Sequence, residues 1–262
     1  MKYFKNLSVV STILIFASCT NSKKENANVY ERFPATFTSL LQTNGGLEKW
    51  QSFGTMEYDL LNPQDSTREH HLISLWNRKD LIVADSFRIG YDGKEVWVAP
   101  NKKAYKGNSA RFYHNLFFYF LSVPYVLADP NISYEEDTVH LNGVAYPSIK
   151  ASFGSGVGDA DKDVYKMVID PATKKLYGLL YTVTYFSNQT QSKYSFLKYE
   201  DWQEANGLQF PGKLVSYKFV NDSIKEKRFE FAFKNIQLKP EAPDEKIFAM
   251  PAQAEIDSLI KR

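Results

Sequence analysis

Turn dipeptides built from asparagine, aspartate and glycine recur along this chain, and they constrain its fold more than any other feature. Asp92-Gly93, Asn142-Gly143, Asn206-Gly207 and Asn221-Asp222 each separate two runs of β-forming residues. Such dipeptides favour the two-residue turns of β-hairpins, and the proline-containing stretch 170–173 is a further turn. Strands joined by turns this tight must be antiparallel neighbours. The sequence therefore predicts one long meander from about residue 132 to residue 236.

Apolar and polar side chains alternate within these runs, as they do in a strand with one buried face. Residues 177–185 and 215–219 carry aromatic or aliphatic side chains at every second position, and residues 228–234 alternate phenylalanine with charged residues. Earlier β-rich runs lie at 55–61, 68–76, 80–88 and 95–99. Because strands do not alternate regularly with helices, a doubly wound α/β fold is excluded. We expect a sheet of about ten antiparallel strands.

Two segments show helical spacing instead. In residues 28–53, Pro34 suits a first helical turn, and Asn44-Gly45-Gly46 provides a helix end. Residues 110–122, which Asn108 or Ser109 could cap, are apolar nearly all round, and such a helix is buried on most sides. The predicted fold class is therefore mainly β: an open antiparallel β half-barrel with an amino-terminal helix and an inner aromatic helix.

Aromatic residues make up 15% of the chain. A sheet of about ten twisted strands curls strongly, so it has a concave face toward which these side chains can point. Its concave face is apolar and must be covered, yet each of the two helices is only ~10 Å across. The sheet must then close on itself or keep an apolar groove, where burial of a ligand would contribute roughly 25 cal/mol per Å². The alternative is that the rings fill the interior completely and leave no cavity.

The amino terminus has the order of a bacterial lipoprotein signal. Lys2 and Lys5 precede the uncharged run 7–17, which is too short to span a bilayer. Phe16-Ala17-Ser18-Cys19 then resembles the lipobox, with Phe16 in place of the usual leucine. We predict a signal peptide at 1–18, a lipidated Cys19 with a polar tether at 19–28, and a single domain at 29–262. An ordinary secretory signal with an incidental cysteine is the alternative.

Residues after the anchor indicate a destination. Thr20 is not the aspartate that retains enteric lipoproteins at the inner membrane, and Lys23-Lys24 differs from an acidic surface-export run. We therefore expect an outer-membrane lipoprotein that faces the periplasm, with the membrane as its partner through Cys19. Removing residues 1–18 leaves 30 basic against 30 acidic residues. Because phosphate binding needs concentrated positive charge, we expect no nucleic-acid partner.

Three stretches carry a resemblance to a known family. Residues 40–50, 91–97 and 243–251 are similar to the opening helix, a strand-turn-strand and the ending of a Bacteroidota lipoprotein family near the lipoprotein-localisation factors LolA and LolB. The resemblance implies an open β-barrel with a helical lid that accommodates acyl chains or another hydrophobic ligand. No segment matches the protruding membrane-inserting loop of LolB.

We predict that aromatic and aliphatic side chains line a ligand site on the concave face. The residues chosen are Phe117, Phe118, Phe120 and Leu121 on the inner helix, with Trp76 and Trp97 on strands. Their role would be to contact an acyl chain or a similar apolar body. The chain has no Gly-x-Ser-x-Gly, His-Glu-x-x-His or paired-cysteine motif. We accordingly predict neither a catalytic residue nor a cofactor.

Polar residues offer weaker candidates. Asp159, Asp161 and Asp163 have the alternate spacing of a calcium loop, but Val164 stands where that loop needs glycine. A solvated loop between strands explains them better. His70 and His71 must point to opposite faces of a strand, and we interpret them, with His114 and His140, as separate structural histidines. Glu57, Asp59 and Glu69 could supply an acid pair, although solvent-facing strand positions explain them better.

Three functions remain open at this point. The first is non-catalytic binding of a hydrophobic small molecule or lipid in the concave cavity. The second is a module that binds an envelope protein, in the manner of RseB-like regulators. The third is an envelope hydrolase whose acid pair is assembled from distant strands.

Overall fold

The computed structural model describes residues 29–156, 158–187 and 189–258. The predicted signal peptide, Cys19 and the tether lie outside these ranges, so the lipoprotein anchor stays a prediction. In the described ranges, no helix is long and apolar enough to cross a membrane.

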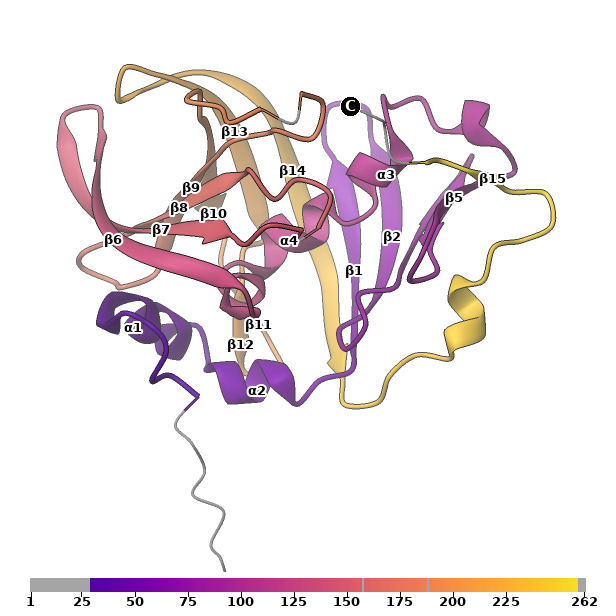
Figure 1. Cartoon of the computed structure of the whole chain (residues 1–262), viewed down its shortest axis with the longest axis horizontal. Helices are drawn as coiled ribbons and strands as arrows, with labels where there is room; N and C mark the ends of the chain where they lie inside the picture. The colour runs from indigo at the N-terminus through magenta and orange to yellow at the C-terminus, as the bar shows by residue number, and fades with distance from the viewer. Residues whose placement is uncertain (1–28, 157, 188, 259–262) are drawn as a thin grey trace, which may run out of the picture.

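One antiparallel sheet of 13 strands dominates the structure, in the order β15-β5-β4-β3-β2-β1-β14-β13-β10-β9-β8-β7-β6 (Figure 1). Its strands are β1 (Thr55–Asn62), β2 (Thr67–Ser74), β3 (Asp80–Ala84), β4 (Arg88–Tyr91), β5 (Val96–Ala99), β6 (Ile132–Leu141), β7 (Val144–Phe153), β8 (Val164–Ile169), β9 (Leu176–Tyr181), β10 (Ser195–Glu200), β13 (Lys213–Val220), β14 (Ser223–Lys239) and β15 (Glu255–Ile256). A separate ribbon pairs β11 (Gln203–Ala205) with β12 (Leu208–Phe210). Because β15 and β6 are the two edges, the sheet is open, as predicted.

The prediction of about ten strands is wrong, since the sheet has 13. The run at 80–88 folds back on itself: the amide of Ala84 donates to the carbonyl of Phe87, which separates β3 from β4. β15 adds a further strand of two residues, Glu255 and Ile256, beside β5. Neither feature has a turn dipeptide of the kind that marks the other hairpins.

The asparagine turns lie where the sequence predicts them. Asn142-Gly143 joins β6 to β7 and Asn206-Gly207 joins β11 to β12, with all four residues at φ between 51° and 84°. Asn221 and Asp222, between β13 and β14, have φ of 48° and 56°. Asparagine, aspartate and glycine reach this left-handed region more easily than other residues, so these turns fix the register of their hairpins.

The helices are short. The amino-terminal segment forms α1 (Ala35–Thr43) and α2 (Leu47–Gln51), and the expected inner helix forms α3 (Ala110–Tyr113) and α4 (Leu116–Ser122). Single 3₁₀ turns lie at η1 (Lys102–Ala104), η2 (Tyr125–Ala128) and η3 (Glu245–Phe248). The hydroxyl of Ser109 accepts a hydrogen bond from the amide of Phe112, which caps α3. The helical path breaks at Asn115, whose φ and ψ are −111° and 2°.

The concave side of the sheet is largely filled by α4 and the amino-terminal helices (Figure 1). The ring of Phe117 on α4 lies 4.4 Å from that of Phe231 on β14, measured between centroids. Trp50 of α2 stacks on Tyr125 at 5.0 Å. The interior is therefore a packed aromatic core over most of its width, and a cavity lies where this packing stops.

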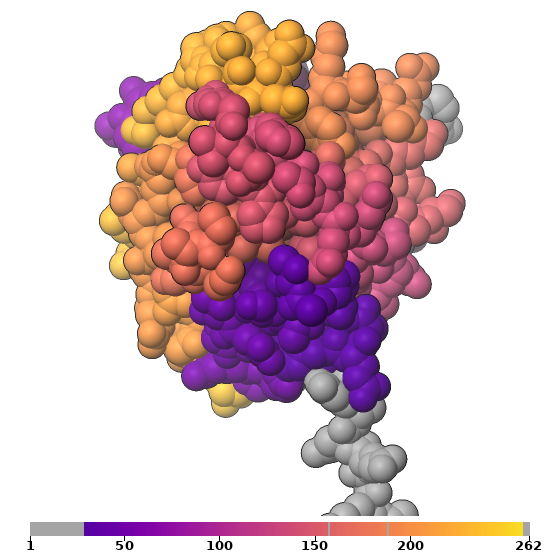
Figure 2. Space-filling view, turned by 90° about the vertical axis from the view of Figure 1, so that its left-hand side faces the viewer, coloured from indigo at the N-terminus to yellow at the C-terminus, as the bar shows by residue number. Residues whose placement is uncertain are grey.

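The amino-terminal helices cover one end of this core. The rings of Phe33 and Phe37 lie 5.6 and 5.0 Å from that of Tyr134 on β6, and Thr36 donates to Glu136 on the same strand. Figure 2 shows the amino-terminal region as a compact patch beneath the strands of this half of the sheet.

Candidate functional site

A cavity of about 260 Å³ lies between the α3–α4 break and the strands β7, β8 and β9. Segments 158–163 and 182–185 complete its wall. Eight aromatic side chains line it: Tyr91, Phe112, Tyr119, Phe120, Phe153, Tyr165, Tyr181 and Tyr185. A preformed hollow lined by rings with a few polar groups is the usual form of a small-molecule site.

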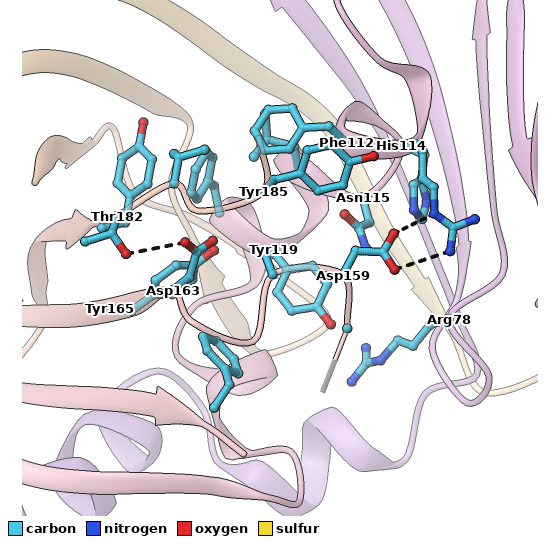
Figure 3. A pocket seen from close by; sticks show the side chains of 18 of the residues that line it. Arg78, Phe112, His114, Asn115, Tyr119, Asp159, Asp163, Tyr165, Thr182 and Tyr185 are labelled. Atoms are coloured by element: carbon cyan, nitrogen blue, oxygen red, sulfur yellow. Dashed lines mark hydrogen bonds and ion pairs between the residues drawn. The ribbon is translucent and has the colours of Figure 1, made fainter. Parts of the chain in front are cut away.

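Polar side chains stand among these rings (Figure 3). Arg111 on α3 donates from Nε and Nη2 to the two carboxylate oxygens of Asp159, at 2.6 and 3.3 Å. Its Nη1 also lies 3.8 Å from Glu95. The hydrogen bond to Asp159 raises the pKa of Arg111. This ion pair joins the segment that follows β7 to the helix on the opposite side of the cavity.

His114 lies at the helix break and is held by a buried carboxylate. Its Nδ1 is 2.6 Å from Oδ2 of Asp80 on β3. Burial raises the pKa of Asp80, although the nearby imidazoles of His114 and His71 oppose that shift. The other oxygen of Asp80 is buried and has no hydrogen-bond partner in the described part of the chain. The Asp80–His114 pair therefore ties α3 to the sheet.

Arg78 reaches the cavity from the turn between β2 and β3, where its own φ is 62°. Its Nη2 donates to both oxygens of Asp129, at 2.8 and 2.6 Å. The guanidinium also lies over the ring of Phe118, 5.4 Å from the centroid. Burial raises the pKa of Asp129, and the charge of Arg78 lowers it. The ion pair joins the β2–β3 turn to the end of η2.

Of the six side chains predicted to bind a ligand, Phe120 lines the cavity. Phe117, Phe118 and Leu121 are buried in the main core, in contact with the strands and α2. The structure thus brings α4 to the cavity, but only one face of α4 borders it. A ligand role for these side chains stays a prediction.

The two tryptophans lie away from the cavity. Trp76 is 65% exposed because β2 ends at Ser74 and leaves it in the turn. Trp97 on β5 is buried in a small cluster with Ala99 and Ala254, and its indole nitrogen donates to the carbonyl of Phe248 at 3.0 Å. The structure therefore does not bring them together with Phe120.

The three aspartates with calcium-loop spacing each interact with a different residue. Asp159 binds Arg111, Asp161 accepts from the amide of Gly156 at 2.8 Å, and Asp163 accepts from the amide of Thr184 at 2.7 Å. Within the described ranges, no group of three or more acidic, histidine or cysteine side chains could hold a metal ion.

The other polar candidates also form local contacts. His70 bonds Asp59 at 3.1 Å, whereas His71 contacts Glu69 at 3.0 Å, so the adjacent histidines do point to opposite faces. Glu57 pairs with Lys239 on β14. Glu57, Asp59 and Glu69 do not line the cavity, whose own carboxylates are Asp159 and Asp163.

Sequence reasoning missed most of the polar wall, but one signal for it was visible. Arg111, His114 and Asn115 are the polar interruptions of the aromatic segment 110–122, and all three line the cavity. They mark the side of the helical segment that faces the cavity. Asp159 and Asp163 stand out in the sequence only for their calcium-like spacing, and Arg78 has no signal, because only the tertiary fold brings it to the same hollow.

Three solved structures resemble this fold. A LolA superfamily protein from Nitrosomonas europaea matches 80% of this chain and 98% of its own length, at 11% identity and a TM-score of 0.47. A DUF1329 family protein from Desulfovibrio piger matches 78% and 92%, at 9% identity and a TM-score of 0.47. A candidate outer membrane lipoprotein-sorting protein domain from Vibrio parahaemolyticus matches 78% and 96%, at 11% identity and a TM-score of 0.40.

Two of these three structures are described as a LolA superfamily protein and as an outer membrane lipoprotein-sorting protein domain, the group that the sequence resemblance names. The likeness says nothing of a ligand. The sequence matches no protein-family model and no curated protein.

Proposed function

We propose that this protein binds an apolar or amphipathic small molecule, such as a lipid or its acyl chain, in the cavity beside α3 and α4. Binding involves no chemical conversion. The lipidated Cys19 predicted from the sequence would hold the domain at the outer membrane, facing the periplasm. The observation that carries the proposal is a preformed hollow of about 260 Å³ lined by eight aromatic rings, next to a core that is otherwise packed.

The energetics of such a site favour an apolar guest. Each 100 Å² of ligand surface removed from water would contribute about 2.5 kcal/mol at the usual coefficient. Part of the cavity wall comes from a helix pair and three sheet strands, and the Arg111–Asp159 ion pair holds the segment at 158–163 against the helix before the ligand arrives. A preformed site avoids part of the ordering cost of binding.

Two measurements test this function. Native mass spectrometry of the full chain, purified from its own membranes in a mild detergent, should show co-purified lipid. Titration with the neutral fluorophore N-phenyl-1-naphthylamine should show saturable enhancement of its fluorescence, since the probe gains an apolar environment in the cavity.

A cavity-filling variant assigns the binding to this site. Ala160 lines the cavity, so Ala160→Phe should weaken binding of the fluorophore at least tenfold. Ala172→Phe, on the exposed turn between β8 and β9, is the matched control and should bind as the parent does. Undiminished binding by a folded Ala160→Phe variant would contradict the proposal.

A further inference from the structure

Hydrogen-bond donors gather at one side of the cavity. Nη1 of Arg78 is buried and has no acceptor in the described part of the chain. Tyr119 and Asn115 line the same hollow, and across the described ranges neither the Tyr119 hydroxyl nor the Asn115 amide has a hydrogen-bond partner. Figure 3 shows the guanidinium of Arg78 and the hydroxyl of Tyr119 directed toward each other. The buried Nη1 of Arg78, left unpaired, costs free energy that an incoming acceptor would recover.

Acceptors at this side are already occupied. Both oxygens of Asp159 take hydrogen bonds from Arg111, and both oxygens of Asp129 take them from Arg78. Arg78 also acts on the nearby phenol of Tyr119. Burial raises the pKa of Tyr119, and the positive charge of Arg78 opposes that shift. Both arginines are thus neutralised by a carboxylate, and a ligand group placed here meets the unpaired Nη1 of Arg78, for which it must itself be an acceptor.

The far side of the cavity has the opposite character. Tyr165, Tyr181 and Phe153 form an aromatic wall there, and the carboxylate of Asp163 lies among them, held by the amide of Thr184 at 2.7 Å. In Figure 3, Asp163 and Arg78 lie on opposite sides of the hollow. A negatively charged headgroup beside Asp163 would be repelled by that carboxylate. On the opposite side the carboxylates Asp129 and Asp159 form ion pairs with Arg78 and Arg111, so an amphipathic anion is favoured with its headgroup there.

We propose that the cavity selects amphipathic molecules with one acidic headgroup, a carboxylate or a phosphate, which accepts hydrogen bonds from Arg78, Tyr119 and Asn115 while the apolar chain lies among the rings. The inference rests on the proposed function and names the ligand class of the same site. Both headgroups are oxyanions with several acceptor lone pairs, and the test separates them.

The experiment is isothermal titration of the full chain with four ligands that share a twelve-carbon chain, each below its micellar concentration or, for the alcohol, below its solubility limit. They are dodecanoate, dodecyl phosphate, dodecanol and dodecylamine. We expect one of the two anions to bind at least tenfold more tightly than dodecanol, and dodecylamine to bind most weakly. Which anion binds more tightly identifies the headgroup.

Variants assign the selectivity to the donors. Tyr119→Phe removes one hydroxyl and keeps the ring, so it should weaken binding of the preferred anion by at least about tenfold, as expected for one hydrogen bond to a charged group. Its affinity for dodecanol should stay within a factor of two. Arg78→Gln should reduce the preference for the anion further. Tyr217→Phe and Arg88→Gln, on β13 and β4 outside the cavity, serve as controls.

The two proposals fail in different ways. Equal affinity for dodecanol and both anions, or an unchanged anion affinity in Tyr119→Phe, would overturn the headgroup inference while binding in the cavity stands. A preference for dodecylamine would overturn it as well. If none of the four ligands binds, or if Ala160→Phe binds them all as the parent does, the cavity function itself falls.

Discussion

At the residue scale, two strand glycines make room for large rings. Gly90 on β4 lies opposite Trp97 on β5, and a Cβ added to Gly90 would come within 2.2 Å of the indole. A Cβ on Gly178 of β9 would come within 2.4 Å of the ring of Phe196 on β10. A glycine inside a strand weakens it unless something packs closely there. In both places a neighbouring aromatic side chain covers the bare backbone.

Gly90→Ala tests this packing. The added methyl group cannot coexist with the buried indole of Trp97, which is also held by its hydrogen bond to Phe248. Overpacking should lower the free energy of unfolding by about 1–3 kcal/mol, measured by urea denaturation. The double variant Gly90→Ala/Trp97→Leu should lose less stability than the sum of the two single variants. Strict additivity would show that the contact is not the cause.

At the element scale, Asp59 joins three strands. It lies on β1 and accepts hydrogen bonds from Arg68 on β2 at 2.6 Å and from Asn235 on β14 at 2.5 Å, besides its contact with His70. Asn235 has φ of 54° at a register irregularity between β1 and β14. Burial raises the pKa of Asp59, but hydrogen bonds from Asn235, Arg68 and His70 outweigh it, so the pKa lies below its ordinary value.

Asp59→Asn should therefore show a pH-dependent loss of stability. A lowered pKa in the folded state gives stability that is present above the ordinary aspartate pKa of about 4 and is lost as the pH falls through the folded-state value. At pH 7 the variant should lose about 2 kcal/mol in urea denaturation. The difference in free energy of unfolding between the parent and the variant should narrow as the pH falls below about 4. Asp85→Asn, at an exposed position, is the control and should have the same free energy of unfolding as the parent. A loss of stability in Asp59→Asn that does not change with pH would contradict the role given to the Asp59 carboxylate.

Local rules explain what could be predicted at this scale. The hairpins were predictable because their dipeptides adopt positive φ, as at Asn142 and Asn221. The tight turn at 85–87 has no such dipeptide, so the sequence does not predict it. The β-rich composition of residues 68–76 predicts a strand that includes Trp76, but β2 ends at Ser74. Trp97 was expected to face the hollow, whereas η3 and β15 cover it, and both belong to the distant carboxyl-terminal region.

At the scale of the whole molecule, β14 joins the two halves of the sheet. It is 17 residues long and pairs with β13 through its first part and with β1 through its second. α4 packs against both halves through one core that includes Phe117 and Leu121. The sequence could not show how completely this helix fills the concave face. Nor could it show the cavity, because Arg78, Arg111 and Asp159 come from segments far apart in the chain.

Two neighbouring residues of α4 separate core packing from ligand contact. Leu121 is fully buried and does not line the cavity, whereas Phe120 does. Leu121→Ala should cost about 2–5 kcal/mol of stability and leave the affinity for N-phenyl-1-naphthylamine unchanged in the folded protein. Phe120→Ala should lower stability and affinity together. Urea denaturation and fluorophore titration give the two quantities, and an equal change in affinity for both variants would refute this division of α4.

The open sheet leaves two edges to which a second chain could add a strand. β15 offers only two residues for pairing, while β6 is ten residues long and carries Glu135, Glu136 and Asp137 in succession. Two copies of β6 meeting edge to edge would bring these carboxylates together, and like charges on an edge strand oppose such pairing. The acidic run on the longer open edge thus disfavours addition of a second copy there, even though the sheet is not sealed into a ring.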